Sequence, residues 1–181
     1  FTSGATQSLN MIISGFFNEY LNDFDEVLIT KAEHASNILP WFNIDKNIKV
    51  KYIELDNDLV NMENVIKSIT PNTKVISIAH ITNVIGDIRP IKEICKYAHE
   101  RGILVVVDGA QSVPHIKTDV QDLDVDFLAF SGHKMCGPTG IGVLYGKYEL
   151  LDKVKPQNVG GGMNNSFESD STYKYKTLPH R

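Results

Sequence analysis

The chain has 181 residues, of which 42% are hydrophobic and 22% are charged, a composition typical of a globular domain that can bury a core. It contains 18 Lys and Arg against 22 Asp and Glu, a net charge of −4 without long runs of one sign, which argues against nucleic acid as the main partner. No apolar run approaches the roughly 20 residues of a membrane helix, and the N-terminus lacks the pattern of a signal peptide. The two cysteines, Cys95 and Cys136, cannot form a disulfide framework, so we expect a cytoplasmic protein.

Helix-like and strand-like segments alternate along the chain. Residues 6–21 have helical apolar spacing, and Thr6 is the expected N-cap. The elements predicted after it are a strand at 26–30, a helix at 35–43 crossed by Pro40, a strand at 49–55, a helix at 58–69, a strand at 75–79, a helix at 90–101, strands at 103–107, 127–130 and 142–145, and a short helix at 148–154. Strands separated by helices pair in parallel through crossovers. We therefore predict an α/β domain of three layers, with a mostly parallel sheet flanked by helices.

Polar residues directly follow four of these strands, at 32–34, 80–83, 108–111 and 131–134. In open parallel sheets, ligands bind beyond the carboxyl ends of the strands. The sequence therefore predicts a functional site along one rim of the sheet.

Lys134 and Asp108 are the central candidates at this rim. A lysine at a strand end in a buried sheet is partly desolvated, which favours the neutral amine, a nucleophile that forms a Schiff base with an aldehyde. With pyridoxal 5′-phosphate as the aldehyde, a carboxylate is needed beside the pyridine nitrogen, and Asp108 ends an apolar strand. Gln111 could hydrogen-bond the phenolic oxygen of the ring, and Ala110 is small enough for a flat ring to lie against it. Taken singly, Lys134 could be a surface lysine and Asp108 a turn residue.

The cofactor's phosphate needs donors, which the N-terminus of a helix supplies. Thr6, which follows Ala5 at the start of the first predicted helix, is the best-placed hydroxyl, and Ser131 and His133 can add further donors. His34 could stack on the ring face opposite Ala110 and transfer protons, although a single histidine at a strand end is also typical of a simple loop. Asn83 could join Gln111 at the phenolic oxygen.

Several motifs occur in the order in which class V aminotransferases carry them: FTSGAT at 1–6, EH at 33–34, HITNVIG at 80–86, VDGAQ at 107–111 and SGHK at 131–134. Together with GPTGIG at 137–142 and GGGM at 160–163, they resemble more narrowly the cysteine desulfurases that mobilise sulfur for iron-sulfur clusters. The resemblance implies the large domain of a type I pyridoxal-phosphate fold. It also implies Lys134 as the Schiff-base lysine, Asp108 under the pyridine nitrogen, and His34 as the stacking and catalytic histidine. By the same resemblance, Thr6, Ser131 and His133 hold the phosphate, and Asn83 and Gln111 face the phenolic oxygen.

The resemblance further implies a homodimeric enzyme that converts L-cysteine to L-alanine and passes the sulfur, as an enzyme persulfide, to an acceptor protein. In the family the persulfide cysteine and the substrate-binding arginine lie in a C-terminal part that this chain does not reach. We therefore expect a fragment that by itself hardly turns over cysteine. In it, residues 1–155 form the cofactor-binding core, residues 156–181 form a glycine-rich active-site loop and truncated continuation, and the small C-terminal domain is absent. Cys95 in a predicted buried helix and Cys136 at a structural position are not expected to accept sulfur.

The sequence is also compatible with other functions. A selenocysteine lyase or another class V enzyme would share every motif, and a catalytically silent module could retain the fold, although it would not need Lys134, Asp108 and His34 together. The sequence gives less support to a nucleotide-binding domain, because no Gly-x-Gly-x-x-Gly follows a strand and no phosphate loop is present. His133 and Cys136 lack a second ligand pair at the spacing that a metal site requires, so no metal is expected.

Overall fold

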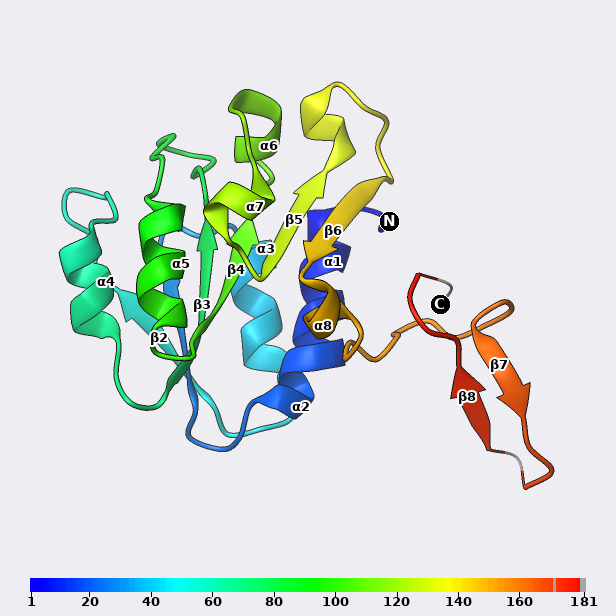
Figure 1. Cartoon of the computed structure of the whole chain (residues 1–181). Helices are drawn as coiled ribbons and strands as arrows, with labels where there is room; N and C mark the ends of the chain where they lie inside the picture. The colour runs from blue at the N-terminus through cyan, green and yellow to red at the C-terminus, as the bar shows by residue number, and fades with distance from the viewer. Residues whose placement is uncertain (171, 180–181) are drawn as a thin grey trace.

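A computed structural model describes residues 1–170 and 172–179 and has a six-stranded sheet at its centre (Figure 1). The strand order is β2-β1-β3-β4-β5-β6. The first five strands in sequence pair in parallel, and β6 is antiparallel to β5. The bounds are β1 (Glu26–Thr30), β2 (Lys49–Ile53), β3 (Thr73–Ala79), β4 (Leu104–Asp108), β5 (Phe127–Ser131) and β6 (Gly142–Gly146). The prediction of a mostly parallel α/β sheet is confirmed.

Helices cover both faces of this sheet. They are α1 (Ala5–Ile12), the π-helical η1 (Ile13–Phe17), α2 (Asn18–Tyr20), α3 (Ala35–Ile38), the 3-10 helix η2 (Leu39–Asn43), α4 (Met62–Ser68), α5 (Ile91–His99), α6 (Ser112–His115), α7 (Val120–Leu123), the 3-10 helix η3 (Gly132–Met135) and α8 (Tyr148–Leu151). The predicted helix at 35–43 changes from α to 3-10 geometry at Leu39, next to Pro40, whose ring cannot donate the α-helical hydrogen bond. In Figure 1, α4 and α5 lie on one side of the sheet, and α1 and α3 lie on the other.

The two faces of the sheet form two apolar clusters. On one face, Leu9 and Ile12 of α1 and Phe17 of η1 pack with Val27 and Phe127 of the sheet. The other face packs α4 and α5 against β-strand residues, with Val65, Ile94, Ala98, Leu28 and Val105 all completely buried. Because β1, β3 and β4 are covered on both sides, nearly all of their residues are buried, without the alternation of a strand that has one face in solvent.

The N-terminus of α1 is held against the sheet by a close backbone approach. The N–H groups of Thr2 and Gly142 each donate to the carbonyl of the other, at 3.0 and 2.7 Å. A Cβ atom at position 142 would lie 2.4 Å from the Cα of Gly4, so only glycine fits there. This contact brings the start of α1 to the rim where β5 ends.

Two short strands, β7 (Asn164–Phe167) and β8 (Tyr173–Tyr175), form a separate antiparallel hairpin that the sequence analysis did not predict. The hairpin projects from the main body in Figure 1. Its connection to the body is fixed where the N–H of Lys155 donates to the carbonyl of Gly15 in the π-helical turn, at 2.8 Å. Within the ranges that the structure describes, none of the helices combines the length and the apolar character needed to cross a bilayer.

Candidate active site

The carboxyl ends of β1, β3, β4 and β5 meet at one rim of the sheet, as parallel pairing requires. Ala79 of β3 is the register partner of Asp108 in β4, and Asp108 is the partner of Ala129 in β5. The residues that follow these positions therefore start from neighbouring points on the same edge. All ten candidate residues lie at this rim or on the segments that adjoin it.

Asp108 is the last residue of β4 and is only 5% exposed. Its Oδ1 accepts a hydrogen bond from the N–H of Ala110 at 2.9 Å, and no described residue hydrogen-bonds its Oδ2. Burial raises the pKa of Asp108 above its usual value, and the charge of Glu33 adds to the rise. The N–H of Ala110 and the positive charges of Lys134 and His34 act in the opposite direction on this pKa. The carboxyl group is thus buried, has one oxygen free, and lies within electrostatic range of both candidate bases.

Lys134 lies in η3, directly after β5, and is half-buried. The turn that presents it is tight, because the N–H of Gly137 donates to the carbonyl of Gly132 at 2.9 Å and a Cβ at Gly132 would lie 2.8 Å from Ile141. Over the described ranges, the amine of Lys134 and the ring of the exposed His133 form no hydrogen bond or ion pair. The half-buried position agrees with the partial desolvation that the sequence predicts for this lysine.

Ser131 is buried at the end of β5, and its hydroxyl accepts a hydrogen bond from the N–H of Ala5 at 2.8 Å. The prediction that Thr6 caps the first helix is wrong, because α1 begins at Ala5 and its N-cap is Gly4. Ser131 therefore satisfies the N–H of the first helical residue, whereas a capping side chain would bind the N–H of the second or third. Helical bonding starts with the N–H of Ser8 to the carbonyl of Gly4, which leaves the N–H groups of Thr6 and Gln7 without an acceptor in the helix.

His34 is the N-cap of α3, and its Nδ1 accepts from the N–H of Ser36 at 3.2 Å. The hydroxyl of Ser36 lies 3.0 Å from the same Nδ1 and 2.7 Å from the hydroxyl of Thr6. A short polar chain therefore connects the start of α1 with the imidazole. Because Nδ1 accepts, a neutral ring carries its proton on Nε2. Ser36 was not among the predicted site residues, and its only sequence signal is its place two residues after the histidine.

Three further candidates, Asn83, Ala110 and Gln111, adjoin the rim. Asn83 and His34 line the same open cavity of about 480 Å³. Gln111 is half-buried at the N-cap of α6, and Ala110 beside it is 7% exposed. In the part of the chain that the structure covers, the side-chain amides of Asn83 and Gln111 form no hydrogen bond. The charges of Lys134 and His34 thus act on Asp108, and Thr6 is linked with His34 through Ser36. Among the described residues, the side chains of Asn83, Gln111 and His133 form no hydrogen bond or ion pair.

These residues fit pyridoxal phosphate. The free oxygen of a buried carboxyl is the partner that a protonated pyridine nitrogen needs, and an unpaired amine at the same rim can take an aldehyde. The first turn of α1 offers N–H groups for a phosphate. Polar side chains with unused hydrogen-bonding groups, at Asn83, Gln111 and His133, surround the same edge.

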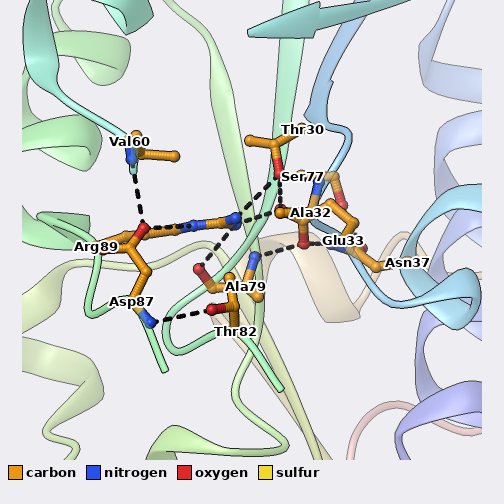
Figure 2. Close-up of polar contacts among 10 residues, drawn as sticks. All are labelled: Thr30, Ala32, Glu33, Asn37, Val60, Ser77, Ala79, Thr82, Asp87 and Arg89. Carbon is orange, nitrogen blue, oxygen red and sulfur yellow. Dashed lines mark hydrogen bonds and ion pairs between the residues drawn. The ribbon is translucent and has the colours of Figure 1, made fainter. Parts of the chain in front are cut away.

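A buried ion pair beside His34 was missed by the sequence analysis. Glu33 and Arg89 have completely buried side chains and pair with each other next to the ends of β1 and β3 (Figure 2). In the sequence, Glu33 stands out only as the neighbour of His34, and none of the motifs includes Arg89. The available sequence signal for a buried arginine was its place between two apolar residues, Ile88 and Pro90.

Comparison with known proteins gives consistent matches over the whole chain. The family model described as aminotransferase class-V matches residues 1–181. A probable cysteine desulfurase from Halalkalibacterium halodurans is 48% identical over 166 residues, which are 90% of this chain and 41% of that protein. A cysteine desulfurase from Haloferax volcanii is 43% identical over 178 residues, covering 96% of this chain and 42% of that protein. The crystal structure of the cysteine desulfurase CsdA from Escherichia coli superposes with a TM-score of 0.93 at 38% identity, over 98% of this chain and 45% of that one. The chain spans about two-fifths of the length of the curated relatives that it matches.

Proposed function

Because the chain belongs to the class V aminotransferase family, we propose that it forms the pyridoxal-phosphate-binding part of a cysteine desulfurase. The observation that carries the proposal is the buried carboxyl group of Asp108. One of its oxygens has no hydrogen-bond partner among the described residues, and the positive charge of Lys134 is near enough to lower its pKa. The names and identities of the curated relatives support the choice of activity. Residues 1–155 are assigned to the cofactor-binding core, and residues 156–181 to the active-site loop and its continuation.

When bound, pyridoxal phosphate would supply an aldehyde for attachment to an amine and a cationic ring that withdraws electrons from the substrate. Asp108 would accept a hydrogen bond from the ring nitrogen and keep the proton on it. Lys134 would hold the cofactor through its Nζ, and as a free amine it would carry a proton to and from the substrate Cα. His34, whose neutral ring has its proton on Nε2, would cover one ring face and exchange a proton there.

The remaining candidates would orient the cofactor. The N-terminus of α1, with Ala5 and Thr6, and the side chains of Ser131 and His133 would bind the phosphate. Since the hydroxyl of Ser131 already accepts from Ala5, it would fix this end of the helix and offer its own proton to a phosphate oxygen. Ala110 leaves room for the second ring face, and Asn83 and Gln111 would donate to the phenolic oxygen.

The proposal includes L-cysteine as the substrate, L-alanine as the product, a sulfur-acceptor protein of iron-sulfur cluster assembly as the partner, a homodimer, and a cytoplasmic location. The relatives' names support the substrate. The free thiols of Cys95 and Cys136 support a reducing compartment. Cys95 is completely buried, and burial raises its pKa to about 12, so its thiol is a poor sulfur acceptor.

The test is to incubate the purified protein with pyridoxal phosphate, reduce it with borohydride and map the modified residue by mass spectrometry. We expect a visible absorption band that disappears on reduction and a label on Lys134. A label on another lysine would refute the assignment of the site. Formation of alanine from L-cysteine by the full-length protein, with sulfide released when a thiol such as dithiothreitol is supplied to reduce the persulfide, would establish the reaction, whereas transfer of the amino group to an oxo acid would refute it.

A further inference from the structure

The Glu33–Arg89 ion pair is the most enclosed charged group among the described residues, with both side chains 0% exposed. Burying two charges costs free energy, and replacing such a pair by apolar residues is often neutral for stability. Stability alone is therefore a weak reason for the pair. Its position suggests another role, because it lies between two segments that carry candidate cofactor ligands.

One end of the network fixes the segment that carries His34. Oε1 of Glu33 accepts from the hydroxyl of Thr30 at 2.7 Å, and Oε2 accepts from the side-chain amide of Asn37 at 2.9 Å. Asn37 in turn accepts from the hydroxyl of Ser77 at 2.6 Å. Glu33 is thus bound on both sides of its neighbour His34, to the end of β1 and to the first helical turn after it.

The other end fixes the loop that carries Asn83, residues 80–89. The backbone N–H of Arg89 donates to the carbonyl of His80 at 2.9 Å, and the N–H of Asp87 donates to the hydroxyl of Thr82 at 3.0 Å, so the loop is closed at its base. Nε of Arg89 lies 3.5 Å from the carboxylate of Asp87. The guanidinium therefore holds the returning arm of this loop.

The two ends meet at β3. Oε2 of Glu33 accepts from the N–H of Ala79 at 2.7 Å, and Nη1 of Arg89 donates to the carbonyl of Ala79 at 3.3 Å as well as to Glu33. Nη2 of Arg89 donates to the hydroxyl of Thr30 at 3.0 Å. Figure 2 shows the guanidinium reaching from Asp87 to Thr30 and Glu33, with Ala79 between the two loops. Ala79 is the register partner of Asp108, so the network is centred one strand away from the candidate carboxylate.

We propose that Glu33 and Arg89 are positioning residues, which set the spacing between the segment bearing His34 and the loop bearing Asn83 and thereby shape the cofactor slot. The effect on the cofactor rests on the proposed function, whereas the effect on the two loops does not. The planar guanidinium bridges three groups in fixed directions, which the single ammonium of a lysine does not reproduce.

Two variants test the proposal without removing the buried charge balance. Arg89→Lys keeps the positive charge and loses the planar guanidinium with its several N–H donors. Thr30→Val removes the hydroxyl that hydrogen-bonds both Glu33 and Arg89, and it conserves the shape of the side chain. Lys92→Met is the matched control, because it breaks an ion pair with Asp122 whose side chains are 59% and 61% exposed. Each variant is first melted, and measurements are made at least 15 °C below its melting temperature, so that only folded protein is compared.

Hydrogen exchange without cofactor is the first readout. We expect amide exchange at least tenfold faster in residues 31–37 and 80–89 of both variants, with unchanged rates elsewhere in the sheet and in Lys92→Met. Unchanged exchange in the two segments would overturn the positioning role, whether or not the protein binds pyridoxal phosphate.

Cofactor affinity is the second readout. We expect the dissociation constant for pyridoxal phosphate to rise at least fivefold in Arg89→Lys and Thr30→Val, and the circular dichroism of the bound cofactor to weaken. If exchange accelerates while wild-type protein fails to attach the cofactor at Lys134, the proposed function fails and the positioning role stands. If wild-type protein attaches pyridoxal phosphate and both variants bind it with the wild-type dissociation constant and circular dichroism, the Glu33–Arg89 pair does not shape the cofactor slot.

Discussion

The hydroxyl of Ser131 at the end of β5 accepts a hydrogen bond from the N–H of Ala5 at the start of α1, at 2.8 Å. Two segments 126 residues apart in sequence are joined by this bond, which satisfies the N–H of the first residue of α1, a helix without a side-chain cap. It also places the free N–H groups of the first helical turn at the same rim as Lys134.

We expect Ser131→Ala to lower the free energy of unfolding by about 1 kcal/mol, because the buried N–H of Ala5 loses its hydrogen-bond acceptor. Urea unfolding followed by far-ultraviolet circular dichroism measures this change. Ser3→Ala is the control, since Ser3 is exposed and its hydroxyl has no hydrogen-bond partner in the described chain; we expect a change within about 0.5 kcal/mol. Equal stability of the two variants would show that the bond between Ser131 and Ala5 does not stabilise the fold.

Gly142→Ala tests the close approach between β6 and the start of α1. The added Cβ would lie 2.4 Å from the Cα of Gly4, and this clash cannot be relieved by a side-chain rotation, because the Cβ is fixed by its own backbone and the atom it meets is backbone. We expect a loss of at least about 2 kcal/mol in the free energy of unfolding, in the range of overpacked interiors. Thermal melting against Gly160→Ala, where the new methyl meets nothing within 4 Å, separates this clash from a general effect of glycine replacement.

The two cysteines are expected to differ in reactivity. Cys95 is completely buried in α5, with a pKa raised to about 12 by burial and by the nearby carboxylates of Asp126 and Asp124. Cys136 is exposed at the end of η3. Titration with an aromatic disulfide reagent at pH 8 should release one equivalent of thiolate from native protein and a second only in guanidinium chloride. Mapping of the native label to Cys95 would contradict the burial that the structure shows.

The strands and the rim could be predicted from the sequence, because both follow from local pattern. β1 was expected at 26–30 and runs from Glu26 to Thr30, since an apolar run between turn residues has few alternatives. Parallel pairing then puts the residues after each strand at one edge, which is why the sequence alone predicts that Asp108 and Lys134 lie at the same rim.

Other features depend on contacts that no local pattern encodes. The acceptor for the N-terminus of α1 comes from Ser131, so the expectation of Thr6 as the cap failed. The Glu33–Arg89 pair joins residues 56 positions apart. The four-residue helices α6 and α7 are too short to show a helical period, and the β7–β8 hairpin begins with the polar run Asn164–Phe167, which has no β-branched residue.

Asp108→Asn separates the contribution of the carboxylate to cofactor binding from its contribution to the stability of the fold. Because burial raises the pKa of Asp108, the folded chain binds a proton in a pH range where the unfolded chain has released it, so this group lowers stability as pH rises from about 4 toward its folded pKa. Asparagine has no charge to bury and can still accept from the N–H of Ala110. We therefore expect cofactor-free Asp108→Asn to be at least as stable as wild type at pH 7 in urea unfolding, with a flatter dependence on pH, and to bind pyridoxal phosphate at least tenfold more weakly. A variant that lost stability at neutral pH would mean that the ionised carboxylate supports the fold, and one that kept the wild-type affinity would remove Asp108 from the proposed site.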